Sequence, residues 1–263
     1  MILLDVVEVL KNQTILLKNL IMFKTIFLII TEIIKSFFKK TFDLNFLYCP
    51  KCKKKKIFIK YGNSPTSIRC LGCSRTIKPL SILTYVKELK LNSNSYVYEL
   101  SFHGPVFDYL KSNFKNFYFS EFYPSRTKGE KINNIFNQDV QDLTFQDDFF
   151  DFISCTEVFE HVPEYLIGFS EIYRTLKKGG VFCFTVPLYS NLKTEHLCEI
   201  DESGNLRWLG KPEFHDSRIT GPNTVPVFWK NSENQIIQDL KKTGFKEAKI
   251  KYDYSFSKLV PAK

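Results

Sequence analysis

Glycine is scarce in this sequence, since only 11 of the 263 residues are glycine, which is few for a nucleotide-binding fold. Long uncharged apolar runs are also missing. Charged residues interrupt the most hydrophobic segment, 15–40, and leave Thr25–Thr31 as its longest uncharged stretch. A bilayer-spanning helix needs about 20 predominantly apolar residues. The first residues also lack a basic region followed by an apolar core and a cleavage site, so neither a span nor a secretory leader is expected.

What the sequence does contain is the composition of a globular protein, with 44% hydrophobic and 25% charged residues. Its length suits one α/β domain of about 150–200 residues with a small appendage. The net charge of +9 is concentrated in residues 1–60, which hold twelve lysines and four acidic residues. A basic segment outside the catalytic part favours an anionic membrane surface or an acidic partner at least as well as nucleic acid.

Residues 1–44 are predicted to form an amphipathic, basic helical segment. On a helical wheel of residues 15–40, the polar residues gather on one arc and apolar residues lie away from it. Such a helix packs either on its own domain or a partner helix, or on an anionic membrane surface. The polar arc contains Lys18, Lys24, Glu32, Lys35, Ser36 and Lys39, and the apolar residues are Leu17, Ile21, Leu28 and Phe38.

Residues 45–80 are predicted to form a small zinc-ribbon-like module with four cysteine ligands. Two CxxC pairs, Cys49 with Cys52 and Cys70 with Cys73, are separated by 17 residues. Each CxxC turn directs two thiolates at one point, and two turns complete a tetrahedral structural zinc site. The alternatives are a ribbon that has lost its metal and a redox pair. Paired cysteines of this kind indicate a reducing compartment, so we expect a cytoplasmic protein, with peripheral membrane contact as an option.

Residues 94–263 are predicted to form a Rossmann-like, doubly wound and mostly parallel α/β domain, because strands and helices alternate along them. The unpaired Cys155 and Cys183 lie in apolar runs as small core residues. The predicted strands are 96–100, 117–121, 151–155, 180–186 and a late strand at 246–253, and the predicted helices lie near 105–113, 163–177 and 232–243.

Acidic residues near the ends of the first two predicted strands suggest a nucleotide site. Glu99 is followed by a turn that ends in Gly104 before a helix. Glu121 comes 22 residues later, where a ribose-binding acid belongs in a Rossmann unit, because a carboxylate accepts hydrogen bonds from both ribose hydroxyls. Taken alone, the glycine-poor first turn also suits an ordinary strand, turn and helix.

Residues 139–187 resemble the class I methyltransferase family often labelled type 11. Members of that family read D-x-x-x-L-P-F, a strand led by F-D, then E-H-V, a helix ending R-x-L-K-P-G-G, and a strand ending in proline. The order of the matches is more specific than any one of them. The matching residues are Asp139–Phe145, Phe150 with Asp151, Glu160–Val162, Arg174–Gly180 and Pro187.

The resemblance covers about residues 94–253 and implies methyl transfer from S-adenosylmethionine. It implies that Asp139 contacts the adenine amino group, Val140 lies against the ring and Glu121 holds the ribose. Gly179 and Gly180 are expected to close the preceding helix through a left-handed turn. The residues assigned to the cofactor site are Glu99, Ser101, Gly104, Glu121, Asp139, Val140 and Cys155.

The acceptor side is predicted to follow the fourth strand, where His161 is the natural general base beside Glu160. Glu157, Glu160 and His161 also form an E-x-x-E-H motif similar to that of small-RNA 2′-O-methyltransferases and ubiquinone-pathway O-methyltransferases. That similarity implies a divalent ion, Mg²⁺ or Mn²⁺, held by these residues and a later histidine, for which His215 is the best candidate and His196 the second. The alternatives are a metal-free base and a purely structural loop.

Residues 188–230 are too long for a simple connection and are expected to form an acceptor-binding insert. Its aromatic residues supply either a stacking surface or a local core. The predicted function is O-methylation of a glycan or small hydroxylated metabolite. The alternatives are an RNA methyltransferase that docks through its zinc module, and a non-catalytic interaction protein with a decayed methyltransferase fold. The aromatic residues are Trp208, Phe214, Phe228 and Trp229.

Overall fold

The computed structural model describes residues 42–62, 67–189, 193–217 and 219–251, together with part of 30–38. Within these ranges the chain forms two compact units, one up to Ile77 and one from Lys78 onward. The amphipathic helix predicted over residues 15–40 lies mostly outside the described residues. None of the helices in the described part is long and apolar enough to cross a membrane.

The first unit is built on a three-stranded antiparallel sheet in the order β1–β2–β3. The strands are β1 (Phe42–Cys49), β2 (Lys54–Tyr61) and β3 (Ile68–Cys70). The fully buried side chains are few, and two of the cysteines are among them. A core this small cannot stabilise a fold by burial alone. The most buried residues of this sheet are Cys49, Phe58, Ile68 and Cys70.

The second unit contains a six-stranded sheet in the order β6–β7–β5–β4–β8–β9. All neighbours pair in parallel except β6 and β7, which are antiparallel. Because β5 and β8 lie on opposite sides of β4, the strand order reverses between β4 and β8, which is where open α/β sheets bind ligands. The strands are β4 (Tyr96–Glu99), β5 (Asn116–Glu121), β6 (Lys131–Ile132), β7 (Ile135–Asn137), β8 (Phe150–Thr156) and β9 (Leu176–Thr185).

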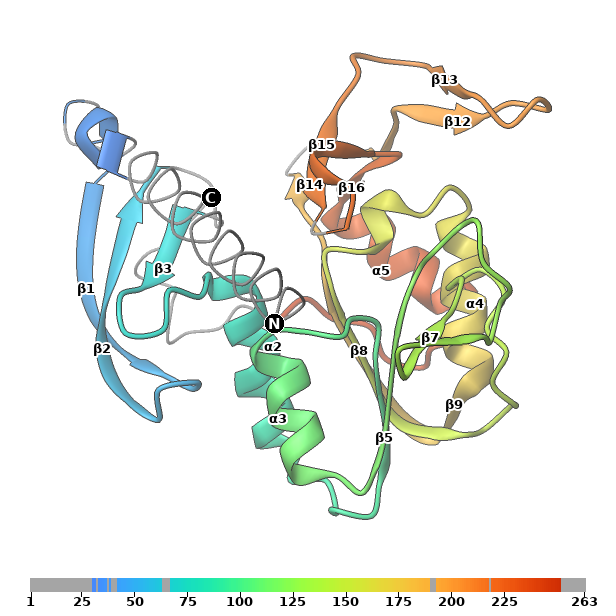
Figure 1. The fold of residues 1–263 in the computed structure, drawn as a ribbon, viewed down its shortest axis with the longest axis horizontal. Helices are drawn as coiled ribbons and strands as arrows, with labels where there is room; N and C mark the ends of the chain where they lie inside the picture. The colour runs from blue at the N-terminus through green and yellow to red at the C-terminus, as the bar shows by residue number, and fades with distance from the viewer. Residues whose placement is uncertain are drawn as a thin grey trace, which may run out of the picture. The chain divides into compact units, whose positions relative to one another are not determined.

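Helices cover both faces of this sheet, with α3 and α4 on opposite sides of β5 and β8 (Figure 1). The side chains of α4 and α5 pack on an aromatic core that includes Tyr98, Phe150 and Phe169. The predicted strands and helices from residue 96 to residue 243 are confirmed within a few residues, apart from the early start of β9. No element was expected at α2. The helices are α2 (Ile77–Glu88), α3 (Pro105–Asn113), α4 (Tyr165–Thr175) and α5 (Glu233–Lys242).

The late strand predicted at 246–253 is wrong for the residues that the structure describes, because 246–251 form no strand. Phe245 and Ala248 pack against the core, while Lys251 pairs with Glu88 on α2. The alternation of apolar and basic residues therefore follows side-chain packing alone, without backbone pairing. Among the described strands, the sheet ends at β9.

The glycines expected to close the helix before the fifth strand lie elsewhere. Helix α4 already ends at Thr175, and Gly179 has φ +82 near the start of β9. The left-handed conformation is confirmed, but it accompanies a register irregularity between β8 and β9. A Cβ at Gly180 would come 3.1 Å from the carbonyl oxygen of Phe150, so a side chain there would force these strands apart.

Two residues of the family-like motif stabilise the fold. The Asp151 carboxylate accepts the backbone N–H of Tyr96 at 2.7 Å and pairs with Lys177 at 2.9 Å. The Arg174 guanidinium donates to Glu171 and to the carbonyl of Leu143, which fixes the loop that precedes β8. These contacts explain why an aspartate and an arginine suit those places without any part in chemistry.

Candidate active site and cysteine cluster

Glu99 and Glu121 end adjacent parallel strands, so they lie on one edge of the sheet. Glu99 is buried, burial raises its pKa to about 8, and the Ser154 hydroxyl donates to its Oε2. Glu121 is half-buried, and its Oε1 accepts the backbone N–H of Phe122 at 3.1 Å. Burial also raises the pKa of Glu121. Of these two carboxylates, that of Glu121 is the one that solvent or a ligand can reach.

The first turn leaves open space at the start of α3. Gly104 has φ +104, and no heavy atom lies within 4 Å of where its Cβ would be. A non-glycine residue would be strained in this conformation. Ser101 does not point into the turn unpartnered, because its hydroxyl donates to the His103 carbonyl at 3.2 Å. A single glycine therefore provides an open helix N-terminus, where backbone N–H groups favour negative or polar ligand groups.

The remaining residues assigned to the cofactor site differ in exposure. The backbone N–H of Gln138 donates to the carbonyl of Glu121 at 3.0 Å, so Asp139 follows directly beside the end of β5. Its carboxylate accepts the backbone N–H of Gln141 at 2.9 Å. Val140 and Cys155 are buried in the core cluster. Their contacts with a cofactor stay predictions, and the structure gives both a packing role.

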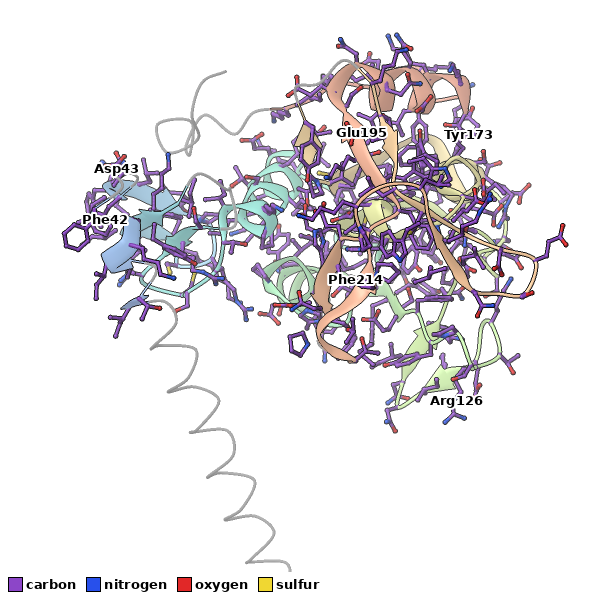
Figure 2. All side chains as sticks on the ribbon, turned by 90° about the horizontal axis from the view of Figure 1, so that it is seen from above. Phe42, Asp43, Arg126, Tyr173, Glu195 and Phe214 are labelled. Carbon is purple, nitrogen blue, oxygen red and sulfur yellow. The ribbon has the colours of Figure 1, made fainter. Side chains whose placement is uncertain are left out.

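The segment predicted as an acceptor insert forms short strands, of which β14 and β15 make a hairpin (Figure 1). Its register pairs Phe214 with Pro226 and His215 with Val225. Figure 2 labels Glu195 and Phe214 on two of these strands. The strands are β10 (Leu188–Tyr189), β11 (Glu195–His196), β12 (Cys198–Ile200), β13 (Leu206–Trp208), β14 (Phe214–Ser217), β15 (Gly221–Pro226) and β16 (Trp229–Ser232).

This hairpin brings His215 to the predicted acceptor-side residues. The short 3₁₀ helix η2 (Phe159–His161) follows β8 and carries Glu160 and His161. His215 Nδ1 lies 3.1 Å from His161 Nε2, and it lies 3.9 Å from Glu160 Oε1. Ligand atoms of these three residues all lie within 4.8 Å of one another. Residues 54 positions apart thus form one cluster at the carboxyl end of β8.

The protonation of His161 follows from its neighbours. Its Nδ1 lies 2.7 Å from the carbonyl oxygen of Pro226, which only accepts, so Nδ1 carries the proton. Burial lowers the pKa of His161 to about 4, which keeps the ring neutral. The Nε2 lone pair therefore points into the cluster, in the tautomer that ligates metals.

Glu160 is the anomaly of the site. Its side chain is buried, and neither carboxylate oxygen has a hydrogen-bond partner. Burial, and then the nearby Glu157 charge, raise its pKa. A buried carboxylate without a partner is costly, which makes Glu160 a candidate ligand for a bound group.

Glu157, the first acid of the predicted motif, does not join the cluster. Its Oε2 accepts from the Lys78 ammonium at the start of α2, and its backbone has φ +55. The metal set of four predicted ligands is therefore reduced to Glu160, His161 and His215. The expected alternative His196 stacks on Trp229 at 3.9 Å between ring centroids and lies outside this set.

Several residues of the site escaped sequence analysis. Glu213 lies 3.8 Å from His215 Nε2 and pairs with Lys230 at 3.0 Å. Its spacing of two from His215 is the signal that was available, because alternate residues of an extended chain share a face. Thr185 and Asn231 each have a buried side-chain atom without a partner. No sequence pattern marks these two residues, and only the fold places Thr185 opposite Thr156 of β8 and Asn231 opposite Leu188 of β10.

The aromatic residues of the insert divide between the two interpretations. Phe228 is buried, and the Trp229 indole N–H donates to the carbonyl of Val162 at 3.0 Å. The ring centroids of Trp208 and Phe214 lie 5.2 Å apart, and Phe214 is partly exposed. The first pair belongs to a local core, and only the second pair offers surface to a ligand.

The four cysteines of the first unit converge as predicted. Cys49 Sγ lies 3.8 Å from Cys73 Sγ, and Cys52 Sγ lies 3.9 Å from Cys70 Sγ. None of the cysteines in the described residues is in a disulfide. A regular tetrahedron with metal–sulfur bonds of about 2.3 Å has edges of about 3.8 Å. The thiols are therefore spaced as the corners of a metal site.

Comparison with known families decides the class of the second unit. A family model described as a methyltransferase domain matches residues 101–247, more than half of the chain. The chain belongs to this methyltransferase family. The family assigns the domain to methyl transfer dependent on S-adenosylmethionine. Among curated proteins, none matches the chain.

The solved structures that match the chain are distant from it in sequence. An S-adenosylmethionine-dependent methyltransferase from Mesorhizobium loti is 16% identical, with 62% of this chain and 80% of that chain covered and a TM-score of 0.40. A second match is the complex between the Haloferax volcanii Trm112 methyltransferase activator and a protein described as a methyltransferase. It is 17% identical, with 59% of this chain and 62% of that chain covered and a TM-score of 0.40. The Haemonchus contortus phosphoethanolamine N-methyltransferase 2 was solved with phosphomonomethylethanolamine and S-adenosylhomocysteine. It is 16% identical, with 64% of this chain and 37% of that chain covered and a TM-score of 0.39. The chain spans less than two thirds of the Haloferax and Haemonchus proteins.

Proposed function

We propose that this protein transfers a methyl group from S-adenosylmethionine to a hydroxyl oxygen of a small hydroxylated metabolite or glycan. The observation that carries the proposal is the buried Glu160 carboxylate, unpartnered beside two imidazoles at the carboxyl edge of the sheet. Oxygen acceptors need help with deprotonation during transfer. A site rich in acidic and neutral imidazole groups suits that requirement.

The residues at the strand ends fit the methyl donor. The open space at Gly104, where any other residue would be strained at φ +104, adjoins the start of α3. Glu121 keeps one carboxylate oxygen without a bond to the protein in the contacts described, and it occupies the expected ribose position. These residues would bind and orient the donor, and Glu99, buried behind them, would shape the floor of the site.

Glu160, His161 and His215 fit a divalent ion of the Mg²⁺ or Mn²⁺ kind. The buried Glu160 carboxylate has no hydrogen-bond partner, and it lies within 4.8 Å of ligand nitrogens of His161 and His215. This donor set suits such an ion. Such an ion, when bound, would lower the pKa of a nearby hydroxyl. The Pro226 carbonyl would hold the His161 tautomer, and Glu213 would orient His215 from the far side of its ring.

Charge favours a neutral acceptor. Residues 61–263 contain 25 basic and 24 acidic residues, so the catalytic unit has no excess of positive charge to hold a polyanion. Partly exposed Trp208 and Phe214 could stack on the ring of a sugar. A glycan or another polyhydroxylated molecule matches this combination better than RNA does.

We further propose that the four cysteines of the first unit bind one structural zinc ion. The spacing of 3.8 and 3.9 Å between thiol pairs supports it. Four thiolates close the coordination sphere and leave no position for a reactant. The role of this site would be to stabilise the first unit, whose apolar core is small.

The proposed reaction is tested by transfer of a tritiated methyl group from S-adenosylmethionine to fractionated cell extract, with and without Mn²⁺. The decisive variant is Glu160→Gln, which keeps the shape of the side chain and removes its charge. We expect it to weaken Mn²⁺ binding, measured by electron paramagnetic resonance, by more than about a hundredfold. Methyl transfer to the hydroxylated fraction should fall with it.

The matched control is Glu164→Gln, because Glu164 is an exposed glutamate four residues further along the chain. It should leave Mn²⁺ affinity and methyl transfer unchanged. Equal Mn²⁺ affinity in the Glu160→Gln and wild-type proteins would refute the metal assignment. Transfer only to nitrogen or to RNA fractions would refute the acceptor class and leave the enzyme class intact.

A further inference from the structure

One face of the three-stranded sheet in the first unit is apolar and exposed. Along β1, every second residue from Leu44 to Tyr48 is exposed, and Phe46 retains 65% of its surface. Ile57 on β2 and Leu71, which is 57% exposed, are also exposed large hydrophobic residues. We call Leu44, Phe46, Tyr48, Ile57 and Leu71 the apolar face.

The strand register places these side chains together. Phe46 pairs with Ile57 across β1 and β2, and residues opposite each other in an antiparallel pair share a face. The backbone N–H of Leu71 donates to the carbonyl of Ile57 at 2.9 Å, which continues the pairing of β2 with β3 by one residue. The three residues therefore form a row across the sheet.

Most of the buried residues of the sheet lie on the other face, where Cys49 and Phe58 alternate with the exposed positions and are buried together with Cys70. Ile59, which pairs with Leu44, is the buried member of the apolar face itself. The five exposed residues are thus separate from the cysteine cluster. A contiguous exposed apolar surface of this kind marks a place of interaction.

Positive charge lies at one end of this face and on the opposite face of the sheet. Residues 42–77 contain eight basic residues and a single acidic one, Asp43, at the start of β1 (Figure 2). Lys55 pairs directly with Tyr48, and Lys53 and Lys54 lie in and beside the turn between β1 and β2. An apolar face in a strongly basic unit, with lysines at one end of the face, is complementary to a surface that is anionic outside and hydrocarbon inside.

We infer that the apolar face docks on an anionic lipid surface, with its hydrophobic side chains inserted at the headgroup boundary and its lysines among the lipid phosphates. Each lysine near an anionic bilayer strengthens binding several-fold. Leucine, isoleucine and phenylalanine are the side chains that enter the acyl region, and tyrosine suits its boundary.

Two other occupants fit less well. Nucleic acid bases stack on aromatic rings, but three of the five residues, Leu44, Ile57 and Leu71, are aliphatic. A second copy of the chain would bring two strongly basic surfaces together, which is unfavourable. The preceding helical residues Ile30 and Ile34, one turn apart and both about half exposed at 48% and 52%, extend the apolar character toward the N-terminus.

The test uses the full chain and vesicles of phosphatidylcholine with or without phosphatidylserine. We expect at least about tenfold tighter binding to the vesicles that contain phosphatidylserine, with a loss of affinity at high salt. The double variant Phe46→Ser with Leu71→Ser should bind at least about tenfold more weakly. In a Phe46→Trp protein, brominated lipids should quench the fluorescence that this substitution adds to that of Trp208 and Trp229.

The matched control is the pair Ile200→Ser and Leu209→Ser, which removes two apolar residues of the insert that are each 50% exposed. It should leave vesicle binding unchanged. If the double variant at Phe46 and Leu71 loses its metal, Lys55→Glu replaces it and should weaken binding to phosphatidylserine vesicles alone. Absence of quenching at residue 46 would overturn the proposal. The proposal would also be overturned if the wild-type protein bound no lipid vesicles, and the variants instead lost binding to single-stranded RNA or lost self-association.

Discussion

The two units of this protein are stabilised in different ways. In the first, a three-stranded sheet buries few side chains, and four thiols converge beside them. In the second, aromatic residues from β4, β8 and α4 form a continuous core around a six-stranded sheet. The first unit is strongly basic, while the rest of the chain is almost neutral. Size alone accounts for much of the difference in how the units are stabilised. Small domains bury too little apolar surface to fold without a metal, a disulfide or a similar cross-link.

The comparison implies that each unit responds to a different perturbation. A change at the cysteines should affect the first unit and spare the sheet of the second. A change in the aromatic core should do the reverse. Hydrogen exchange, read by mass spectrometry over peptides of each unit, can follow both responses in one sample.

Disruption of the proposed zinc site should have the largest effect. We expect Cys70→Ser, or a strong chelator, to unfold residues 42–77, because structural zinc contributes on the order of 10 kcal/mol to such modules. Amides of β1, β2 and β3 should lose protection, while those of β8 and β9 keep it. The control is Cys183→Ser, outside the cluster, which should retain one zinc per chain by elemental analysis. Equal protection of β1 with and without chelator would contradict the metal's role.

The aromatic core supplies the opposite test. Phe150 is fully buried and contacts Tyr98 and Phe145 at ring-centroid distances of 5.1 and 4.9 Å. Phe150→Ala should lower the free energy of unfolding of the second unit by about 3–5 kcal/mol through the cavity it leaves. The zinc content should not change. Phe122→Ala, at an exposed phenylalanine, serves as the control and should change the denaturation midpoint little.

Glu99 should make the second unit sensitive to alkali. Its pKa is raised from 4.5 to about 8 in the folded chain, so the folded state holds a proton that the unfolded state releases. Stability is therefore highest below the unfolded pKa and falls as pH rises through about 8. Between pH 6 and pH 9 the loss should be about 3 kcal/mol. Urea unfolding of wild type and Glu99→Gln at both pH values checks it, since the variant should lack this dependence.

Sequence periodicity sufficed for the parallel part of this fold because its signals are local. Alternating apolar strands and amphipathic helices marked β4, β5, β8, α3, α4 and α5, and the motif around Asp139 and Glu160 indicated a methyltransferase domain, which the family model confirms. Helix α2 and the β6–β7 hairpin were missed, although Asn133 and Asn134, both at positive φ in the two-residue turn of that hairpin, were an available turn signal. The strand expected at 246–253 shows the reverse error, because side-chain alternation does not guarantee a backbone partner.

The acceptor site could be predicted only in part. Glu160, His161 and His215 were chosen from motif and residue type, and the hairpin β14–β15 does bring them together. The ion pair between Glu157 and Lys78 depends on where α2 begins, and no local sequence pattern specifies that position. Long-range ion pairs of this kind require the fold itself. The cysteine cluster was simpler, because spacing within each CxxC turn fixes two ligands at a time.

The smallest predicted effect concerns the donor site of the second unit. Glu121→Ala should weaken S-adenosylhomocysteine binding by about 1–3 kcal/mol, because it removes hydrogen bonds from ligand hydroxyls to a charged group. Isothermal calorimetry measures it, and wild-type affinity should lie in the micromolar range, at about −7 to −8 kcal/mol. Glu202→Ala, at an exposed glutamate of the insert, is the control. Unchanged affinity in the Glu121 variant would refute the ribose assignment, whereas a wild-type chain that binds no ligand at millimolar concentration would favour a non-catalytic scaffold. The first unit should be indifferent to both variants, because both residues belong to the second unit.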